Sequence, residues 1–264
     1  MNQAPDIGRS EVIDSAPVEG EKPRQDHRPR VAAQRRAQMR LHILQTSLGA
    51  IGKKGIDAIT IDDFIAAARV SRGTLYNYFN TTNELLLTLT HAMSEEVLAV
   101  IKPRMLGIGD PLHRFSAGIR TYIRTAVRYP VWGRFVTRVD TRIATQGHHF
   151  DEYLFNDLAL AMKSRRVAVA PPMVVRNLVL GTVFHGVEAL LDDPTLDQHG
   201  EHLMAALLRG IGLDAKLAEE VAFLPLPDFG PVEGPLFSSL PVKGGDSDSP
   251  LGRVARPHRP PHLD

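Results

Sequence analysis

The sequence predicts an all-α protein, because apolar residues recur at three- and four-residue spacing along most of the chain. Alternating apolar and polar residues, which would indicate strands, form no convincing run. Gly55, Pro103 and the Tyr129-Pro130 pair mark places where helices are expected to end. The chain of 264 residues is long enough to bury one sizeable core or two smaller ones.

The N-terminal region and the first helix differ in pattern. Residues 1–33 lack hydrophobic periodicity and are rich in proline and charge, so they are predicted to form a disordered basic arm. The first helix is predicted over residues 34–53. Its core face is aliphatic: Leu41, Leu44, Leu48 and Ile51. Basic side chains are concentrated before and inside this helix: Lys22, Arg24, Arg28, Arg30, Arg35, Arg36 and Arg40.

Residues 60–79, with the sequence TIDDFIAAARVSRGTLYNYF, predict two short helices joined by a tight turn. Thr60 is a suitable N-cap for the first helix, and Asp63 stands where a capping box would be completed. Ser71 is a suitable N-cap for the second helix. The inward side chains of the pair are apolar: Ile61, Phe64, Ile65, Ala68, Val70 and Leu75.

The second short helix carries side chains that hydrogen-bond phosphates and base edges. A helix-turn-helix places such a helix in the major groove of DNA. The candidate DNA-binding residues are Thr60, Ser71, Arg72, Gly73, Thr74, Tyr76, Asn77 and Tyr78. The alternative is a pair of surface helices in an ordinary helical domain, but so many polar contact groups beside so few core positions favour DNA binding.

The segment around this motif, residues 40–86, resembles the N-terminal domain of the TetR-like (tetracycline-repressor) family of transcriptional regulators. The resemblance rests on Ile43-Leu44, GIDAIT at residues 55–60, VSRGTLYNYF at residues 70–79 and ELL at residues 84–86. It implies a DNA-binding domain over residues 34–80, with the motif at residues 60–79. A helical effector-binding and dimerisation domain would follow over residues 81–223.

The resemblance also implies roles for single residues. Phosphate contacts would fall on Thr60, Ser71, Tyr76 and Tyr78, and base-edge contacts on Arg72, Thr74 and Asn77. Arg36, Arg40 and Arg69 are further candidates for contact with the DNA backbone. Arg69 stands at the turn position that the family usually fills with glycine, so a positive φ there would cost about 1 kcal/mol relative to glycine.

The rest of the chain also reads as helical up to about residue 223. Further helices are predicted from Thr81 to just before Pro103, over residues 112–126, 132–141, 150–163 and 172–191, and from Asp197 or Gln198 to about Leu208. Residues 224–264 are rich in proline, glycine and serine and have no hydrophobic period, so they are predicted to be a disordered tail.

The last two of these helices are the candidates for dimerisation, because small residues allow helices to approach closely. The first contains Gly181, Thr182, Gly186 and Ala189, flanked by Leu178, Val183, Leu190 and Leu191. The second contains Leu203, Ala206, Leu207 and Gly210. The resemblance implies a four-helix interface built from two such helices of each subunit. The alternative is packing within one chain only.

The middle helices of the family usually enclose a small-molecule pocket, and the resemblance implies one here. Apolar walls are expected from Phe115, Tyr122, Trp132, Phe135, Tyr153, Met162 and Phe184. His185 and Glu188 are candidate polar anchors. Since aromatic residues at helical spacing more often belong to a core, an ordinary apolar core is the alternative. The expected effector is a small apolar or aromatic molecule.

Composition argues against several other classes. The chain has no cysteine, so disulfides, thiolate metal sites and thiol catalysis are excluded. A polar, acidic N-terminus predicts no secretory signal, and no apolar segment is long enough to predict a membrane span. His148-His149 beside Asp151-Glu152 lacks a second ligand cluster, so no metal, cofactor or catalytic site is predicted.

The sequence therefore predicts a cytoplasmic, sequence-specific DNA-binding transcriptional regulator and not an enzyme. The predicted form is a homodimeric repressor that binds a double-stranded operator and is released by a small-molecule effector. The alternative is a ligand-independent or protein-controlled DNA-binding regulator. The formal net charge is only +1, so DNA binding would depend on where the basic residues are concentrated.

Overall fold

The computed structural model describes residues 27–139, 156–161, 163 and 171–243. They belong to two compact units, one ending at Gln38 and the other beginning at Met39. Within these residues the chain forms α-helices and a 3-10 turn at Phe237–Ser239, and no strand. The all-α prediction is confirmed for the part of the chain that the structure describes.

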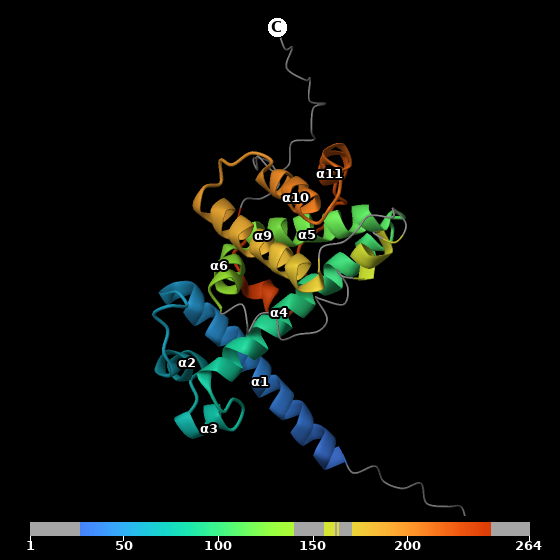
Figure 1. Cartoon of the computed structure of the whole chain (residues 1–264). Helices are drawn as coiled ribbons and strands as arrows, with labels where there is room; N and C mark the ends of the chain where they lie inside the picture. Colours follow the sequence, from blue (N-terminus) through green and yellow to red (C-terminus); the bar gives the residue numbers. More distant parts are fainter. Residues whose placement is uncertain (1–26, 140–155, 162, 164–170, 244–264) are drawn as a thin grey trace, which may run out of the picture. The chain divides into compact units, whose positions relative to one another are not determined.

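Figure 1 shows the order of the helices along the chain. Their bounds are α1 His27–Lys54, α2 Ile61–Ala68, α3 Arg72–Tyr76, α4 Thr82–Met105, α5 Pro111–Arg128, α6 Pro130–Arg138, α9 Pro172–Asp192, α10 His199–Gly210 and α11 Ala215–Ala222. Residues 156–161 and 163 are also helical. We refer to residues 39–79 as the head and to helices α5–α11 as the body.

The N-terminal unit contributes the first turns of α1. The helix begins at His27, which corrects the expectation of a disordered arm up to residue 33. Pro29 lies in the first turn, where the missing N–H is tolerated, and Ala32 and Ala33 are strong helix formers. The remainder of the predicted arm, residues 1–26, lies outside the described residues.

Helices α1–α3 pack around apolar side chains, most of them at the predicted positions, but Leu41 is only half-buried and Ile43 takes a core position that was not predicted. Ile43 and Leu48 on α1, Phe64 on α2 and Leu75 on α3 are fully buried, and Phe79 after α3 joins them. Because each of these residues faces inward, the polar positions between them on α3 face outward. The short helices of the head are thus held by burial more than by their own length.

Helix α4 leaves the head and continues into the body. Thr81 is its N-cap and accepts a hydrogen bond from the N–H of Glu84 at 3.0 Å. The predicted stripe is buried: Leu85, Leu89, Met93 and Val97. The helix does not stop before Pro103 as expected but runs to Met105. Pro103 lacks the N–H that would donate to the carbonyl of Ala99, so the helix loses this one hydrogen bond and ends two residues later.

Helix α5 is the centre of the body, since it packs against α4, α6, α9, α10 and α11. Asp110 caps it, accepting from the N–H groups of Leu112 and His113 at 2.7 and 3.1 Å. Most side chains from Leu112 to Val127 are buried, so α5 is covered on nearly every side. Helix α11, which the sequence analysis did not predict, is capped by Asp214.

Helix α9 combines length with strong apolar character. By length and composition alone it is long enough to cross a membrane, yet it packs against α5, α6 and α10 and buries Val179, Val183 and Val187. The same packing uses Gly186, where an added Cβ would lie 2.7 Å from a methyl group of Leu203 on α10. These contacts are typical of a core helix in a folded domain.

Residues 224–243, which we call the strap, correct the prediction of a disordered tail. The strap is packed, with Val232, Leu236 and Phe237 buried in the core. Burial of these three side chains offsets the entropy that ordering a proline- and glycine-rich segment costs. The predicted tail from residue 244 to residue 264 lies outside the described residues.

Candidate nucleic-acid interface

The N-terminus of α2 is fixed by the predicted capping box. The N–H of Thr60 donates to Oδ2 of Asp63 at 2.7 Å, and the N–H of Asp63 donates to Oγ1 of Thr60 at 3.4 Å. Nζ of Lys54, at the end of α1, also donates to the Asp63 carboxylate at 2.7 Å. These hydrogen bonds, from Lys54 first and from Thr60 next, lower the pKa of Asp63 from 3.8 to about 2. The start of α2 is thereby joined to α1.

The turn between α2 and α3 has a left-handed backbone. Arg69 has φ 54° and ψ 41°, and its N–H donates to the carbonyl groups of Ile65 and Ala66. A residue with a Cβ is strained in this conformation by about 1 kcal/mol relative to glycine. The Arg69 side chain is exposed at this corner, as contact with a DNA backbone would require.

Helix α3 has a buried side and an exposed side. Its N-cap Ser71 accepts a hydrogen bond from the N–H of Thr74 at 3.0 Å. Leu75 is fully buried, while the Tyr76 residue keeps 42% of its surface exposed. Exposed positions on and beside the helix are Ser71, Arg72, Gly73, Tyr76 and Asn77. The helix thus presents a polar surface from a firmly packed base.

Two of the predicted DNA-binding residues are less exposed than the others. Thr74 is half-buried, and the Oγ1 of its side chain lies 2.8 Å from Oγ of Ser71. Tyr78 is partly buried against the apolar core. Both residues therefore support the geometry of α3 as well as offering a hydroxyl group.

Arg72 forms an ion pair with Asp62 on α2. Both side chains are more than half exposed, so this pair is solvated. Sequence patterns did not single out Asp62, because the capping box draws attention to its neighbour. The predicted base reader is therefore bound to a carboxylate of the same motif.

The two candidate arginines on α1 belong to different units. The Arg40 guanidinium lies over the Phe79 ring, 5.4 Å from its centroid, and donates to Oγ1 of Thr88 at 3.4 Å. It therefore packs on the head and on α4. Arg36 is exposed in the N-terminal unit.

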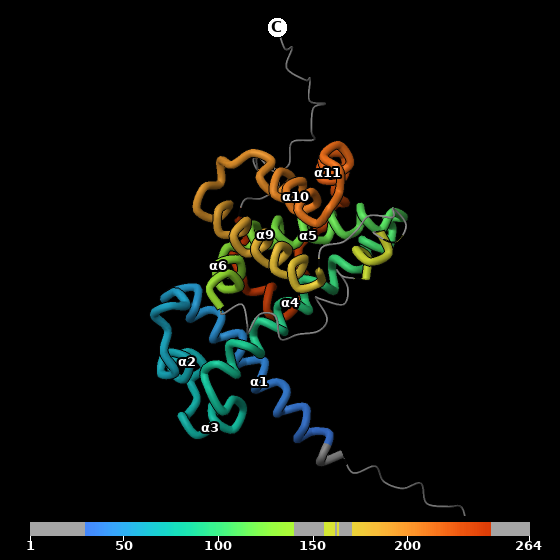
Figure 2. The backbone as a smooth tube through the Cα atoms, viewed as in Figure 1, coloured from blue at the N-terminus to red at the C-terminus, as the bar shows by residue number. Residues whose placement is uncertain are grey.

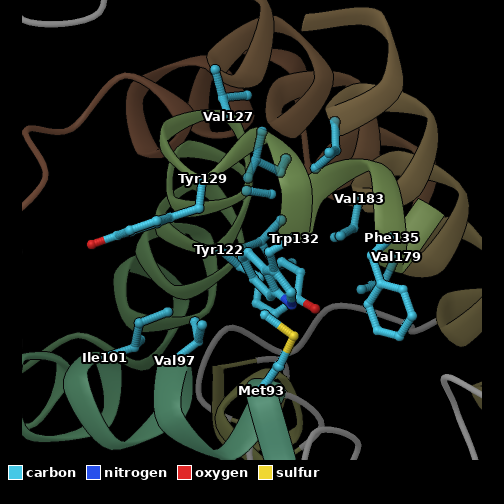
Figure 3. Close-up of a cluster of buried hydrophobic side chains, with 14 of the residues drawn as sticks. Met93, Val97, Ile101, Tyr122, Val127, Tyr129, Trp132, Phe135, Val179 and Val183 are labelled. Atoms are coloured by element: carbon cyan, nitrogen blue, oxygen red, sulfur yellow. The ribbon is translucent and has the colours of Figure 1, made fainter. Parts of the chain in front are cut away.

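The body contains an aromatic cluster that includes part of the predicted pocket. Tyr122 on α5 and Trp132 on α6 meet edge to face with ring centroids 5.0 Å apart. Figure 3 shows Met93 pointing from α4 toward these two rings. Trp132 is fully buried, and its Nε1 donor has no hydrogen-bond partner within the described chain. A buried donor without an acceptor is costly, so this site favours an acceptor from elsewhere.

Some of the other predicted pocket residues lie in the core, and the rest lie outside the described residues or are at least partly exposed. Phe115 and Phe135 are buried, and Phe184 is partly buried against the core. Tyr153 and Met162 lie outside the described residues, as do His148, His149, Asp151 and Glu152. The structure thus brings Tyr122 and Trp132 into direct contact, with Phe135 drawn in the same cluster (Figure 3).

His185 and Glu188 do not face the aromatic cluster, which corrects their expected role as polar anchors. The His185 side chain is 85% exposed, and its Nδ1 lies 3.6 Å from the Glu188 carboxylate. Glu188 also lies 3.7 Å from Nε of Arg138. Val183 and Val187 take the core-facing positions of α9, so residues 185 and 188 turn toward another side of the helix.

A buried charge cluster joins α5 to α10. The Glu201 carboxylate accepts from Arg120 at 3.2 Å and from Arg124 at 2.8 Å. Arg120 also donates to the carbonyl of Leu224 at 2.8 Å. Burial by itself would raise the pKa of Glu201, but the two guanidinium groups outweigh it, and the pKa lies below its ordinary value. The cluster fixes the helices that frame the body.

These features define the class of the protein: an all-α helix-turn-helix protein whose second motif helix exposes polar side chains and is anchored by the buried Leu75. The profile described as bacterial regulatory proteins of the tetR family matches residues 43–89, and the profile described as tetracyclin repressor-like, C-terminal domain, matches residues 110–223. The chain belongs to the TetR family and is a helix-turn-helix transcriptional regulator.

Individual relatives agree with this assignment. Over 68 residues the chain is 34% identical to the uncharacterized HTH-type transcriptional regulator YvdT of Bacillus subtilis (strain 168). That match spans 26% of this chain and 35%, about a third, of the length of the relative.

Solved structures share the fold. RolR in complex with resorcinol has a TM-score of 0.61 and 24% identity, covering 75% of this chain and all of that one. FadR from Bacillus subtilis in complex with stearoyl-CoA has a TM-score of 0.53 and 14% identity, covering 64% of this chain and 98% of that one.

Proposed function

We propose that this regulator acts as a homodimer that binds a two-fold-symmetric DNA operator through α3 and is released from it by a small apolar or aromatic effector. The observation that carries the proposal is the exposed polar surface of α3 above buried Leu75. Repression in the cytoplasm, by blocking RNA polymerase at the operator, is the expected outcome of such binding.

The DNA-reading part of the proposal rests on residue chemistry. Arg72, Thr74 and Asn77 carry groups that hydrogen-bond base edges, whereas Ser71 and Tyr76 carry hydroxyls suited to phosphates. The space around Gly73 is open except for the side chain of Ser71, so a DNA backbone can approach closely. Direct readout from a helix of this kind contributes about 1–3 kcal/mol per well-formed base contact.

The dimerisation part rests on what we call the α9–α10 face: Val174, Leu178, Gly181, Ala206 and Gly210. Val174, Leu178, Ala206 and Gly210 are exposed, and a Cβ on Gly210 would lie 3.6 Å from a Leu178 methyl group, so the two helices form one surface. Around Gly181, apart from its chain neighbours and the nearby backbone of α9 itself, no atom lies within 4 Å of the Cβ position. An apolar surface with room for a second helix supports pairing with another copy.

Other residues of the predicted dimer stripe face inward. Val183, Gly186, Leu190, Leu191 and Leu207 are buried within the chain itself. The proposed interface is therefore narrower than the sequence suggested, and it is confined to the α9–α10 face.

The effector part rests on the aromatic cluster. Trp132 offers a buried Nε1–H donor, and Tyr122 presents its ring edge-on to Trp132. A small aromatic molecule with a hydrogen-bond acceptor would satisfy that donor and stack among these rings. The similar structure of RolR was solved with resorcinol, a molecule of this chemical class.

One observation favours the alternative, a regulator that does not respond to a ligand. Phe237 of the chain itself packs against Trp132, with ring centroids 5.4 Å apart. An effector at that side of Trp132 would have to displace an internal side chain. The two functions differ in whether any small molecule both stabilises the protein and weakens DNA binding.

Selection of bound sequences from random duplex DNA tests the DNA part. The expected result is a single enriched motif with two-fold symmetry and half-sites about one helical turn apart. The same selection with Asn77→Ala and Arg72→Ala should lose base preference within the motif. If the wild-type protein binds no duplex at low salt, the proposal of DNA binding is refuted.

A thermal-shift screen of small aromatic molecules, with resorcinol among them and stearoyl-CoA as a long-chain acyl comparison, tests the effector part. A hit should raise the melting temperature and lower affinity for the selected duplex. The matched variant Trp132→Phe removes the Nε1 donor while it keeps a ring, and it should lose the hit. A broad screen without any hit supports the ligand-independent alternative.

A further inference from the structure

The strap lies beyond the part of the chain that the family profile matches, which ends at residue 223. Figure 2 shows it returning from α11 toward α4 and α6, drawn in red. Its buried side chains, Val232, Leu236 and Phe237, belong to the core of the body. The strap is therefore a packed addition to the profile-matched fold, and its contacts join parts of the molecule that are distant in sequence.

The first contact is with Glu96 on α4. The N–H of Leu236 donates to both carboxylate oxygens, at 3.1 and 3.2 Å, and the N–H of Phe237 donates to Oε2 at 3.1 Å. A Cβ on Gly234 would lie 2.2 Å from Oε2, so the glycine allows the strap backbone to lie directly on the carboxylate. The half-buried Glu96 side chain thus has a binding site shaped by three strap residues.

The second contact is with the head. Nε2 of Gln45, on α1, donates to the carbonyl of Pro235 at 2.8 Å. Pro235 directly precedes the two residues that hold Glu96. Adjacent strap residues are therefore bound to α1 of the head and to α4, the helix that leads from the head into the body.

The third contact is with the aromatic cluster. The Phe237 ring lies edge-on to Tyr129, at 4.9 Å, and to Trp132, at 5.4 Å. The hydroxyl of Tyr129 accepts a hydrogen bond from the N–H of Val232 at 3.0 Å. Phe237 is therefore in direct ring contact with Trp132 of the aromatic cluster.

We infer that the strap is a latch that couples the aromatic cluster to the head. A rearrangement at Trp132 displaces Phe237, and the adjoining Leu236 and Pro235 transmit the displacement to Glu96 on α4 and to Gln45 on α1. The latched strap stabilises the effector-free arrangement of the head. The inference rests on the proposed function, in which the cluster binds the effector and the head binds DNA.

The test without DNA uses the full chain and Trp132, the only tryptophan in the sequence. In Gln45→Ala the amides of Leu236 and Phe237 should exchange about fivefold faster, the factor that one ordinary hydrogen bond carries. Acrylamide should also quench Trp132 more strongly. Gln38→Ala removes an exposed glutamine from the same helix and should change neither reading. Unchanged exchange and quenching in Gln45→Ala would overturn the latch.

A second variant, Gly234→Ala, acts on the other tie, because its Cβ would collide with Glu96. It should raise exchange of the strap amides and of the α1 amides around Gln45 together. If exchange rises in the strap alone, the strap is packed on the head without being coupled to it, and the inference fails.

The test with DNA uses the duplex selected by the wild-type protein. Binding should change Trp132 fluorescence in the wild type, and the change should be much smaller in Gln45→Ala at saturating DNA. If the wild type binds the duplex and Trp132 does not respond, the latch is overturned and the proposed function stands. If no duplex is bound, the proposed function fails, and the exchange experiment alone decides the latch.

Discussion

Arg72, the first residue of α3, is paired with Asp62 on the preceding helix of the same motif. The guanidinium proposed to read a base edge therefore has to leave a carboxylate before it can enter the major groove. An exposed ion pair of this type contributes about 0.2–1 kcal/mol, so breaking it to contact DNA has a small but measurable free-energy cost.

Removing that carboxylate should strengthen DNA binding. Asp62→Asn frees Arg72 and removes one negative charge near the phosphates, so affinity for the selected duplex should rise about two- to fivefold at moderate salt. Fluorescence anisotropy with labelled duplex measures the change. Glu219→Gln, an exposed charge removal on α11, is the matched control and should have no such effect. Equal or weaker binding by Asp62→Asn would contradict the competition.

Tyr76 and Asn77 should separate affinity from specificity. Tyr76→Ala removes a proposed phosphate contact and should weaken binding to all duplexes alike. Asn77→Ala removes a proposed base contact and should cost about 1–3 kcal/mol for the selected motif, with little change for unrelated duplex. Competition binding with both duplexes measures the two effects. The same loss for both duplexes in the Asn77 variant would exclude it as a base reader.

The contribution of the α2 capping box to protein stability should decrease in acid. The Asp63 pKa is lowered from 3.8 to about 2 in the fold, so its contribution is complete above the ordinary pKa and is lost as pH falls toward 2. Asp63→Asn should melt below the wild type at pH 6, and the difference should close between pH 4 and pH 2. Melting curves followed by circular dichroism across this range provide the measurement. A difference that does not vary with pH would argue against this linkage.

A large side chain on the α9–α10 face should prevent dimerisation without unfolding the subunit. Gly181→Arg adds a long charged side chain where the chain itself leaves open space, so it should give a folded monomer. Gly49→Arg is the matched control, because Gly49 on α1 also has open space at its Cβ. Light scattering after size exclusion reports the mass of each variant. A Gly181→Arg protein that stays dimeric would move the interface to another surface.

The buried charge cluster should be sensitive to loss of its carboxylate. Glu201→Ala leaves buried Arg120 facing Arg124 without a counter-charge, and breaking such a buried pair costs about 3–5 kcal/mol. Arg124→Gln should cost less, because Arg124 is partly exposed. Urea unfolding followed by Trp132 fluorescence compares the two. Similar stabilities for Glu201→Ala and the wild type would show that the cluster is already well hydrated.

The caps and the turn of the head could be predicted from local sequence signals. The Thr60 and Ser71 caps and the left-handed turn at Arg69 each depend on a residue and its neighbours within one turn of helix, so they are readable from a short window. The same holds for the periodic stripe of α4 from Leu85 to Val97.

Tertiary structure decided the contacts that join distant residues. Glu96 and Leu236 are separated by 140 positions, and a short window around either residue contains no sign of the other. Packing also decided that Gly186 faces Leu203 within the chain, whereas the Cβ position of Gly181 stays open, although both are small residues on one helix.

The sequence by itself thus determined most of the helices, the Thr60 and Ser71 caps and the chemistry of α3, because hydrogen bonds and periodicity within a helix act over a few residues. Only the folded chain determined that His185 is exposed, that Arg72 is paired with Asp62 and that the strap is ordered. Those outcomes depend on which surfaces are buried together, and burial is a property of the whole chain.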